Sequence, residues 1–228
     1  MKILKVSVLT TALSTVLMTG CTQNYQNVFS TLDEATFGFD DVNKSQQEIA
    51  ALPYASSNII IDEGAQIFVV LALVEPSNNN KDQNQLKWAS SDYGMFVTEN
   101  GRLVKTLRLP SDNLAGLTNP NNTDPLMIDG QKPKQRTWEA IYDWQPNYRF
   151  NFLASINWHF VSQQTIASTT WTKETNYYQE EVYIPSLDYE FINHFWLDKS
   201  THQVVKSIQF IGPDMSSVNM TILKPYAG

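Results

Sequence analysis

The sequence predicts an all-β protein, in which a large curved antiparallel sheet forms a partly open (half) barrel after a short N-terminal helix. Three observations indicate this fold. Apolar and polar residues alternate over most of the chain after Pro53, and turn signals separate the alternating segments at short intervals. The segment 148–161 alternates over its whole length. At about 3.3 Å per residue it would span roughly 46 Å, which is longer than a compact sandwich needs and typical of a large curved sheet.

The first twenty residues have the features of a bacterial lipoprotein signal. Lys2 and Lys5 give a positive start, an apolar stretch runs from Ile3 to Met18, and Thr-Gly precedes Cys21. The small residues suit the peptidase, and the thiol is the attachment point for diacylglycerol. We therefore expect residues 1–20 to be removed and Cys21 to be lipidated. The alternative is a plain signal or a membrane anchor with an incidental cysteine, but a spanning helix needs about 20 clean apolar residues.

Lipidation predicts where the mature chain is held. Each buried methylene contributes about 0.8 kcal/mol, so several acyl chains, such as palmitate, anchor firmly in lipid. Thr22 follows Cys21, where an aspartate would favour retention in the inner membrane of enteric-type bacteria. We therefore expect a domain anchored by lipid to the outer membrane and facing the periplasm. The longest later apolar run, 67–74, has the length of a buried strand.

Composition excludes several classes of protein. The formal charge is −7, from 16 basic and 23 acidic side chains, whereas nucleic-acid binders usually carry a basic excess. One cysteine allows no internal disulfide and no cysteine-rich metal site, and three histidines leave little room for a metal. We expect no cofactor and no nucleic-acid partner.

The mature chain is predicted to comprise a tether with a short helix, 21–53, followed by one antiparallel β domain, 54–228. Asp40 or Asp41 is expected to cap the helix, and Pro53 ends it. Twelve candidate strands follow in meander order, which favours antiparallel pairing. They are 57–62, 66–75, 84–90, 94–98, 102–109, 137–144, 148–161, 166–174, 177–184, 189–198, 202–211 and 217–222.

Turn signals support this order of strands. Asn100-Gly101 predicts a two-residue hairpin, because both positions favour positive φ. A second turn is expected at 198–201. Two longer loops are predicted, at 76–83 and at 110–135, and the second is long enough to be functional.

The segment 148–161 has two contrasting faces. One face is apolar and predicted to be buried: Tyr148, Phe150, Phe152, Ala154, Ile156, Trp158 and Phe160. The other carries polar side chains, with Leu153 as the one large apolar exception. Polar, largely uncharged surfaces suit glycans as well as plain solvent. We take four of these residues as a candidate glycan or partner surface: Arg149, Asn151, Asn157 and His159.

The tryptophans divide into two groups. Trp138, Trp144 and Trp158 lie on apolar faces and are expected in the core, because large rings fill the interior of sheet proteins. Trp171 has threonine neighbours on both sides, so it joins the candidate glycan or partner surface.

No motif supports catalysis. The sequence has no GxSxG, HExxH, P-loop or GxGxxG pattern. A glycosidase needs two carboxylates about 5 to 9 Å apart, and the candidates are expected to be surface charges near turns. They are Asp62, Glu63, Glu139, Glu180, Glu181, Asp188 and Glu190. His194 lies among Phe191, Phe195 and Trp196, where a hydrogen-bonded structural histidine is expected. We predict no catalytic residue.

Three blocks of sequence together resemble one family. They are 49–56; 88–93 with 97–106; and 195–198 followed by 204–209, 212–213 and 223–225. With the lipobox at Cys21, these blocks resemble the YjbF family, also called the group 4 capsule lipoprotein B (GfcB) family. Arg108 and Thr201-His202 depart from its pattern, which commonly has glycines there. The resemblance implies an outer-membrane lipoprotein encoded with capsule or exopolysaccharide export genes and a curved antiparallel β fold. It implies no catalytic residues.

These observations predict a non-enzymatic accessory factor in the production or export of an extracellular polysaccharide. It would bind the nascent glycan or an export-machinery protein, on the sheet or on the 110–135 loop. Two alternatives stay open. One is a periplasmic carrier of a lipid or lipid-linked sugar in a β cleft, which the many aromatic residues favour. The other is a polysaccharide-modifying enzyme.

Overall fold

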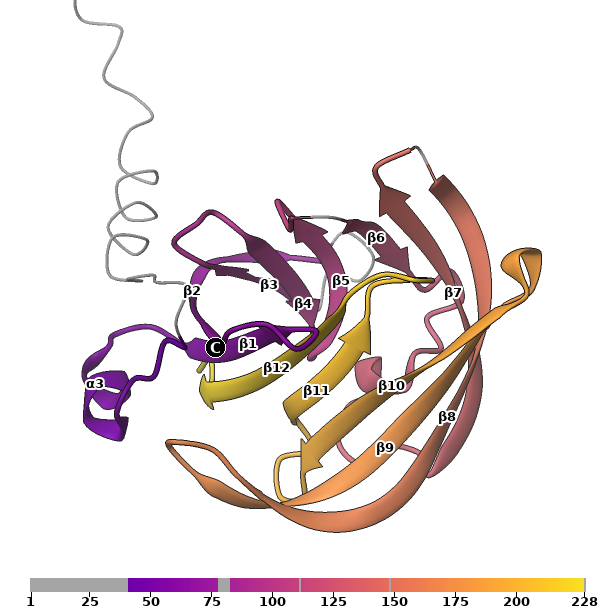
Figure 1. The fold of residues 1–228 in the computed structure, drawn as a ribbon. Coiled ribbons are helices and arrows are strands. Elements are labelled where there is room, and N and C mark those ends of the chain that lie inside the picture. Colours follow the sequence, from indigo (N-terminus) through magenta and orange to yellow (C-terminus); the bar gives the residue numbers. More distant parts are fainter. Residues whose placement is uncertain (1–40, 78–82, 111, 148, 228) are drawn as a thin grey trace, which may run out of the picture.

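The computed structural model describes residues 41–77, 83–110, 112–147 and 149–227, so the predicted lipidation site Cys21 lies outside the described residues. The fold is one twelve-stranded antiparallel sheet that curls into a nearly closed barrel (Figure 1). The predicted large curved antiparallel sheet is therefore confirmed, and it closes further than the half barrel that the sequence suggested. In chain order the strands are β1 (Ser56–Ile61), β2 (Ile67–Pro76), β3 (Asn84–Ala89), β4 (Met95–Glu99), β5 (Arg102–Leu107), β6 (Asn113–Thr118), β7 (Gln135–Gln145), β8 (Arg149–Ala167), β9 (Thr172–Ile184), β10 (Tyr189–Asp198), β11 (Val204–Phe210) and β12 (Ser217–Lys224).

The order of strands across the sheet is β5-β4-β3-β2-β1-β12-β11-β10-β9-β8-β7-β6. Apart from β5 and β6, strands that are consecutive in sequence pair with each other, and the first pairs with the last. The edge strands β5 and β6 meet at a seam that side chains bridge. There Thr106 Oγ1 accepts a hydrogen bond from the Leu114 N–H at 2.9 Å, and Asn113 Oδ1 accepts one from the Leu109 N–H at 3.1 Å.

The strand count agrees with the sequence prediction, but two errors offset each other. Strand β6 lies inside the predicted 110–135 loop, where the Gly and Asn content hid a short apolar alternation. The predicted strand 166–174 does not exist as such. It comprises the end of β8, a tight turn and the start of β9, because β8 is 19 residues long.

Strand β8 follows the predicted alternation only in its middle. Phe152 and Phe160 are half-buried against the core, and the small or apolar side chains between them on that face are fully buried. Phe150, predicted on the buried face, is 47% exposed, because the β7–β8 register shifts between Tyr142 and Trp144 and the alternation breaks there. A register shift between Phe160 and Ser162 leaves Val161 exposed.

The hairpin formed by β8 and β9 runs beyond the other strands and curls under the β10–β11 hairpin (Figure 1). Its tip reaches the end of β12. There Thr170 Oγ1 donates to the Leu223 carbonyl at 2.7 Å, and Trp171 Nε1 donates to the Ile222 carbonyl, also at 2.7 Å.

The short helix α3 (Gln46–Ala51) begins later than predicted. Ser45, not Asp40 or Asp41, is the N-cap, because it forms a capping box with Glu48. Asp41 instead accepts a hydrogen bond from the Gln66 N–H at 2.7 Å. The helix buries Ile49 against the outer face of the barrel, on Phe68, Val70 and Leu223. No helix among the described residues is long and apolar enough to cross a membrane.

Aromatic rings fill much of the barrel interior, as predicted for Trp138, Trp144 and Trp158. Trp158 stacks on Tyr178 with 4.4 Å between ring centroids. Trp144 Nε1 donates to the Ile211 carbonyl at 2.8 Å, so its polar edge is satisfied inside the core. The middle of the barrel is therefore packed rather than hollow.

Candidate functional site

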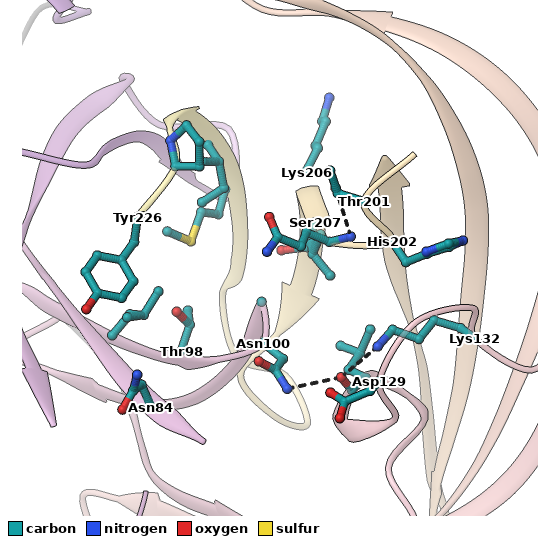
Figure 2. Close-up of a pocket in the computed structure, with 18 of the residues that line it drawn as sticks. Asn84, Thr98, Asn100, Asp129, Lys132, Thr201, His202, Lys206, Ser207 and Tyr226 are labelled. Atoms are coloured by element: carbon teal, nitrogen blue, oxygen red, sulfur yellow. Dashed lines mark hydrogen bonds between the residues drawn. The ribbon is translucent and has the colours of Figure 1, made fainter. Parts of the chain in front are cut away.

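A pocket of about 390 Å³ lies at one end of the barrel (Figure 2). Four parts of the chain enclose it: the β3–β4 hairpin with its following turn, the segment 126–132, the β10–β11 turn, and strands β11 and β12. The pocket runs from an exposed rim to a buried floor. Its lining is Asn84, Leu86, Trp88, Thr98, Asn100, Gly101, Leu126, Asp129, Gly130, Lys132, Thr201, His202, Gln203, Val204, Lys206, Ser207, Met220, Ile222, Pro225 and Tyr226.

Two buried hydroxyl groups lie on the floor of this pocket. Thr98 Oγ1 accepts a hydrogen bond from Trp88 Nε1 at 2.9 Å, and Ser207 Oγ accepts one from Gln209 Nε2 at 2.9 Å. Both residues are 2% exposed. Among the described residues, neither hydroxyl has an acceptor for its own proton, so each has a donor to offer to a ligand.

Gln209 connects the floor to the β4–β5 turn. Its Nε2 also donates to the Gly101 carbonyl at 2.9 Å, and its Oε1 accepts from the Leu103 N–H at 2.9 Å. The predicted Asn100-Gly101 hairpin is confirmed, with φ of 47° and 87°. Gly101 packs so closely on Val204 that a Cβ atom there would lie 2.4 Å from the Val204 Cβ. This close approach positions the turn against β11.

The rim carries little free charge. Lys132 Nζ donates to the Leu126 carbonyl at 3.2 Å and also to the Ile128 carbonyl. Burial lowers the pKa of Lys132, and the nearby carboxylate of Asp129 opposes that change. Lys206 points away from the pocket (Figure 2), with its Nζ 5.2 Å from the ring centroid of Trp196.

A buried ionic cluster lies behind the pocket and holds one wall in place. Arg102 on β5 pairs with Asp124 in the 110–135 segment and with Glu180 on β9, and all three side chains are buried. The Arg102 guanidinium also packs on two rings: its Cζ atom lies 4.6 Å from the ring centroid of Trp138 and 5.1 Å from that of Phe195. The prediction that Glu180 is a surface charge is therefore wrong. Its even-numbered position on β9 places it inside the barrel with Tyr178 and Val182.

The electrostatics of this cluster follow from burial. Burial raises the pKa of Glu180, and the neighbouring Arg102 guanidinium only partly opposes this rise. Burial alone would lower the pKa of Arg102, but the two carboxylates outweigh it and raise that pKa, so the guanidinium stays charged. Asp124 Oδ1 also accepts from the Leu126 N–H at 2.9 Å, at the start of η1 (Pro125–Met127). The cluster thus fixes the pocket wall that carries Leu126.

The β10–β11 turn forms another wall, and Asp198 holds its shape. Asp198 Oδ1 accepts hydrogen bonds from the Ser200 N–H at 2.8 Å and the Thr201 N–H at 3.2 Å, and Lys173 pairs with Oδ2. Burial alone would raise the pKa of Asp198. The hydrogen bonds from Lys173, Ser200 and Thr201 outweigh it, so the pKa lies well below its usual range.

We expect Asp198→Asn to destabilise the protein by about 2 kcal/mol near neutral pH, because charged acceptors make the stronger hydrogen bonds. A lowered pKa in the folded state gives stability that is present above the unfolded pKa, about 3.9 for aspartate, and lost as the pH falls. The deficit should therefore shrink in acid. Urea unfolding at neutral and at acidic pH measures it. Asp188→Asn, in an exposed turn, is the control, and a deficit that does not change with pH contradicts this explanation.

The residues predicted as a glycan or partner surface do not form one site. Arg149 pairs with Asp112 at 3.0 Å, and Asn157 Nδ2 donates to Glu181 at 3.1 Å. His159 follows two positions after Asn157 on the same outer face. Ten residues of strand separate Arg149 from His159, which is roughly 33 Å.

The other two predicted surface residues lie elsewhere. Asn151 is exposed near the start of β8, with φ of 64°, and its N–H donates to Asp143 at 2.7 Å. Trp171 is half-buried at the far tip of the β8–β9 hairpin, where Lys173 Nζ lies 5.7 Å from the centroid of its ring. The structure does not bring the predicted set together.

His194 is hydrogen-bonded, as predicted, and it lies on the outer face of the barrel. Its Nδ1 is 2.7 Å from the Tyr177 hydroxyl, and Tyr177 stacks on Trp196 with 4.9 Å between ring centroids. Burial lowers the pKa of His194.

Sequence reasoning missed the pocket, although it identified two of its walls. The Asn100-Gly101 and 198–201 turns were both predicted, and both line the pocket. Trp88, Thr98 and Ser207 gave no separate signal, because only closure of the sheet brings β3 and β4 opposite β11.

Comparison with known proteins identifies a family whose sequences match almost the whole chain. The model of the family "Group 4 capsule polysaccharide lipoprotein gfcB, YjbF" matches residues 4–223. The uncharacterized lipoprotein GfcB of Escherichia coli K12 is 34% identical over 214 residues, covering 91% of this chain and 94% of that one. The uncharacterized lipoprotein YjbF of the same strain is 29% identical over 208 residues, covering 91% and 93%.

A solved structure has the same architecture. The crystal structure of the hypothetical lipoprotein YmcC from Escherichia coli K12 superposes with a TM-score of 0.74 at 31% identity, covering 91% of this chain and 98% of that one. The family match spans nearly the whole chain, and the resemblance of the three sequence blocks is confirmed. The chain belongs to the GfcB/YjbF family of group 4 capsule polysaccharide lipoproteins.

Proposed function

We propose that this protein is a non-enzymatic outer-membrane lipoprotein that faces the periplasm and assists production or export of a capsular or extracellular polysaccharide. It acts by binding, either to the glycan or to a protein of the export machinery. The observation that carries this proposal is the family match over residues 4–223, because the description of that family names its members as group 4 capsule polysaccharide lipoproteins.

The structure supports binding over the two alternatives. The barrel interior is packed with rings such as Trp144 and Trp158, so the middle of the barrel does not offer a lumen for an acyl chain. The buried carboxylates Asp124 and Glu180 are both held by Arg102, so neither is free to act as a general acid. The end pocket, by contrast, is lined mainly by uncharged polar and apolar groups.

Deletion of the gene in its own host tests the proposal. We expect less polymer in the medium and on the surface, with build-up in the periplasm, under conditions that express the capsule genes. Complementation with the natural gene should restore external polymer. The Cys21→Ser form should restore less and leave the outer-membrane fraction, because it lacks the acyl anchor. Unchanged polymer in every fraction of the deletion strain contradicts the proposed role.

A further inference from the structure

We propose that the pocket at the barrel end binds a short run of neutral sugar residues, with the Thr98 and Ser207 hydroxyls as donors on its floor. This inference rests on the proposed function and names the ligand class and the site. The volume of about 390 Å³ falls within the range of about 300 to 1,000 Å³ that is usual for small-molecule sites.

The floor supplies the polar half of the argument. Each of the two hydroxyls already accepts one hydrogen bond, and among the described residues neither proton has an acceptor. A buried donor without a partner costs about 1–3 kcal/mol unless water or a ligand satisfies it. Sugar hydroxyls and ring oxygens accept such hydrogen bonds. They can also donate to the side-chain carbonyl of Asn100, whose amide group is already used on the Leu126 carbonyl.

The walls supply the apolar half. Trp88, Leu86 and Ile222 are apolar residues of the lining, and the ring of Tyr226, which is 39% exposed, borders the pocket (Figure 2). A pyranose ring presents C–H groups on its faces and hydroxyls around its edge. A pocket with apolar walls, an aromatic ring at its mouth and donors on its floor matches both surfaces at once.

The charges favour a neutral sugar. Of the cationic side chains in the lining, Lys132 is engaged by two backbone carbonyls, and Lys206 lies over Trp196 on the outer face. Asp129 lies near Lys132 and offsets its charge. An anionic ligand would therefore gain little electrostatic attraction here, whereas the hydrogen bonds of neutral hydroxyl groups do not depend on a free cation.

Calorimetric titration of the folded mature domain tests the inference. The probe is short oligosaccharide released by partial acid hydrolysis of the host's own extracellular polysaccharide, separated into neutral and acidic fractions. We expect binding of the neutral fraction, with an affinity that changes less than about twofold on adding salt. Ser207→Ala should weaken binding roughly three- to tenfold, the worth of one hydrogen bond. Tyr226→Ala, beyond the last strand and harmless to the fold, should weaken it similarly.

The chain offers a matched control for Ser207→Ala. Ser162 on the outer face of β8 also accepts a hydrogen bond from a glutamine two positions later, Gln164, at 3.1 Å. Ser162→Ala should leave binding unchanged. Unchanged affinity in both Ser207→Ala and Tyr226→Ala overturns the inference, as does binding of the acidic fraction alone.

Two further arms separate this inference from the proposed function. If Asn157→Ala with His159→Ala abolishes binding while the pocket variants retain it, the glycan binds the outer face and the pocket assignment is wrong. If the pocket variants lose oligosaccharide binding but restore external polymer in the deletion strain as well as the natural gene does, the pocket binds sugar without serving export. Failure of the deletion phenotype itself contradicts the function and leaves the binding result standing.

Discussion

Replacing Arg102 with methionine is expected to destabilise the fold by about 3–5 kcal/mol, because the change leaves Asp124 and Glu180 buried without their counter-charge. Methionine keeps much of the volume of the arginine stem between Trp138 and Phe195, so the loss reports charge more than packing. Urea unfolding, followed by tryptophan fluorescence, measures the free energy of unfolding. Arg149→Met is the matched control, since its pair with Asp112 is partly exposed and should change stability by about 1 kcal/mol or less.

The pH dependence of this variant has a definite sign. Burial already raises the pKa of Glu180, and removing the guanidinium raises it further. A raised pKa in the folded state gives stability that is full below the unfolded pKa, about 4.3 for glutamate, and lost as the pH rises through the folded pKa. The deficit of Arg102→Met should therefore be largest at neutral pH and smaller in mild acid.

A neutral version of the whole cluster tests the same explanation from another direction. Arg102→Met combined with Asp124→Asn and Glu180→Gln removes all three charges, so it should recover most of the lost stability. If the triple variant is as unstable as the single one, unpaired charge is not the cause and the explanation is wrong. The oligosaccharide affinity of the triple variant should also fall, because the wall that carries Leu126 depends on Asp124.

Gly101→Ala is expected to cost about 2–5 kcal/mol. Two effects add: a side chain at φ of 87° costs about 1–2 kcal/mol, and a Cβ 2.4 Å from the Val204 Cβ forces the turn away from β11, at about 1–3 kcal/mol. The same displacement widens the pocket. Unfolding measurements and the affinity for the neutral oligosaccharide fraction report the two consequences.

A variant at Gly130 and a double variant at Gly101 and Val204 separate the backbone cost from the contact cost. Gly130 has φ of 68°, and a Cβ atom added there would meet no atom within 4 Å, so Gly130→Ala should show only the backbone cost. Adding Val204→Gly to Gly101→Ala removes the Val204 Cβ together with both Cγ atoms, so the double variant should recover the contact cost when it is compared with Val204→Gly alone. If Gly130→Ala is as harmful as Gly101→Ala, the close approach of Gly101 to Val204 is not important.

Local signals predicted much of the fold, because they arise from neighbouring residues. Alternation along 148–161 and the φ preference of Asn100-Gly101 need no distant contact, and both were confirmed in the parts that the barrel covers. The helix start was misplaced because Asp41 has a better partner in Gln66, 25 positions away. Strand β6 was missed because its Gly and Asn content hid the short apolar alternation of Leu114 and Leu117.

The pocket and the ionic cluster could not be predicted in the same way. Arg102 and Glu180 are 78 positions apart, and Trp88 and Ser207 are farther apart still. A polar residue in an alternating strand looks the same whether it faces water or a buried partner. Only the curvature of the sheet decides between them, and it brings Glu180 inside while it leaves Asn157 outside.

The pairing of β1 with β12 has a consequence for biosynthesis. β1 leaves the ribosome before the other strands, whereas β12 follows them all in the chain. Until residues 217–224 arrive, one edge of β1 has no partner, and Leu223 cannot complete the apolar patch under α3. An unpaired strand edge invites aggregation. A nascent chain is therefore most vulnerable just before β12 is made, and loss of residues 217–228 would leave one edge of β1 unpaired.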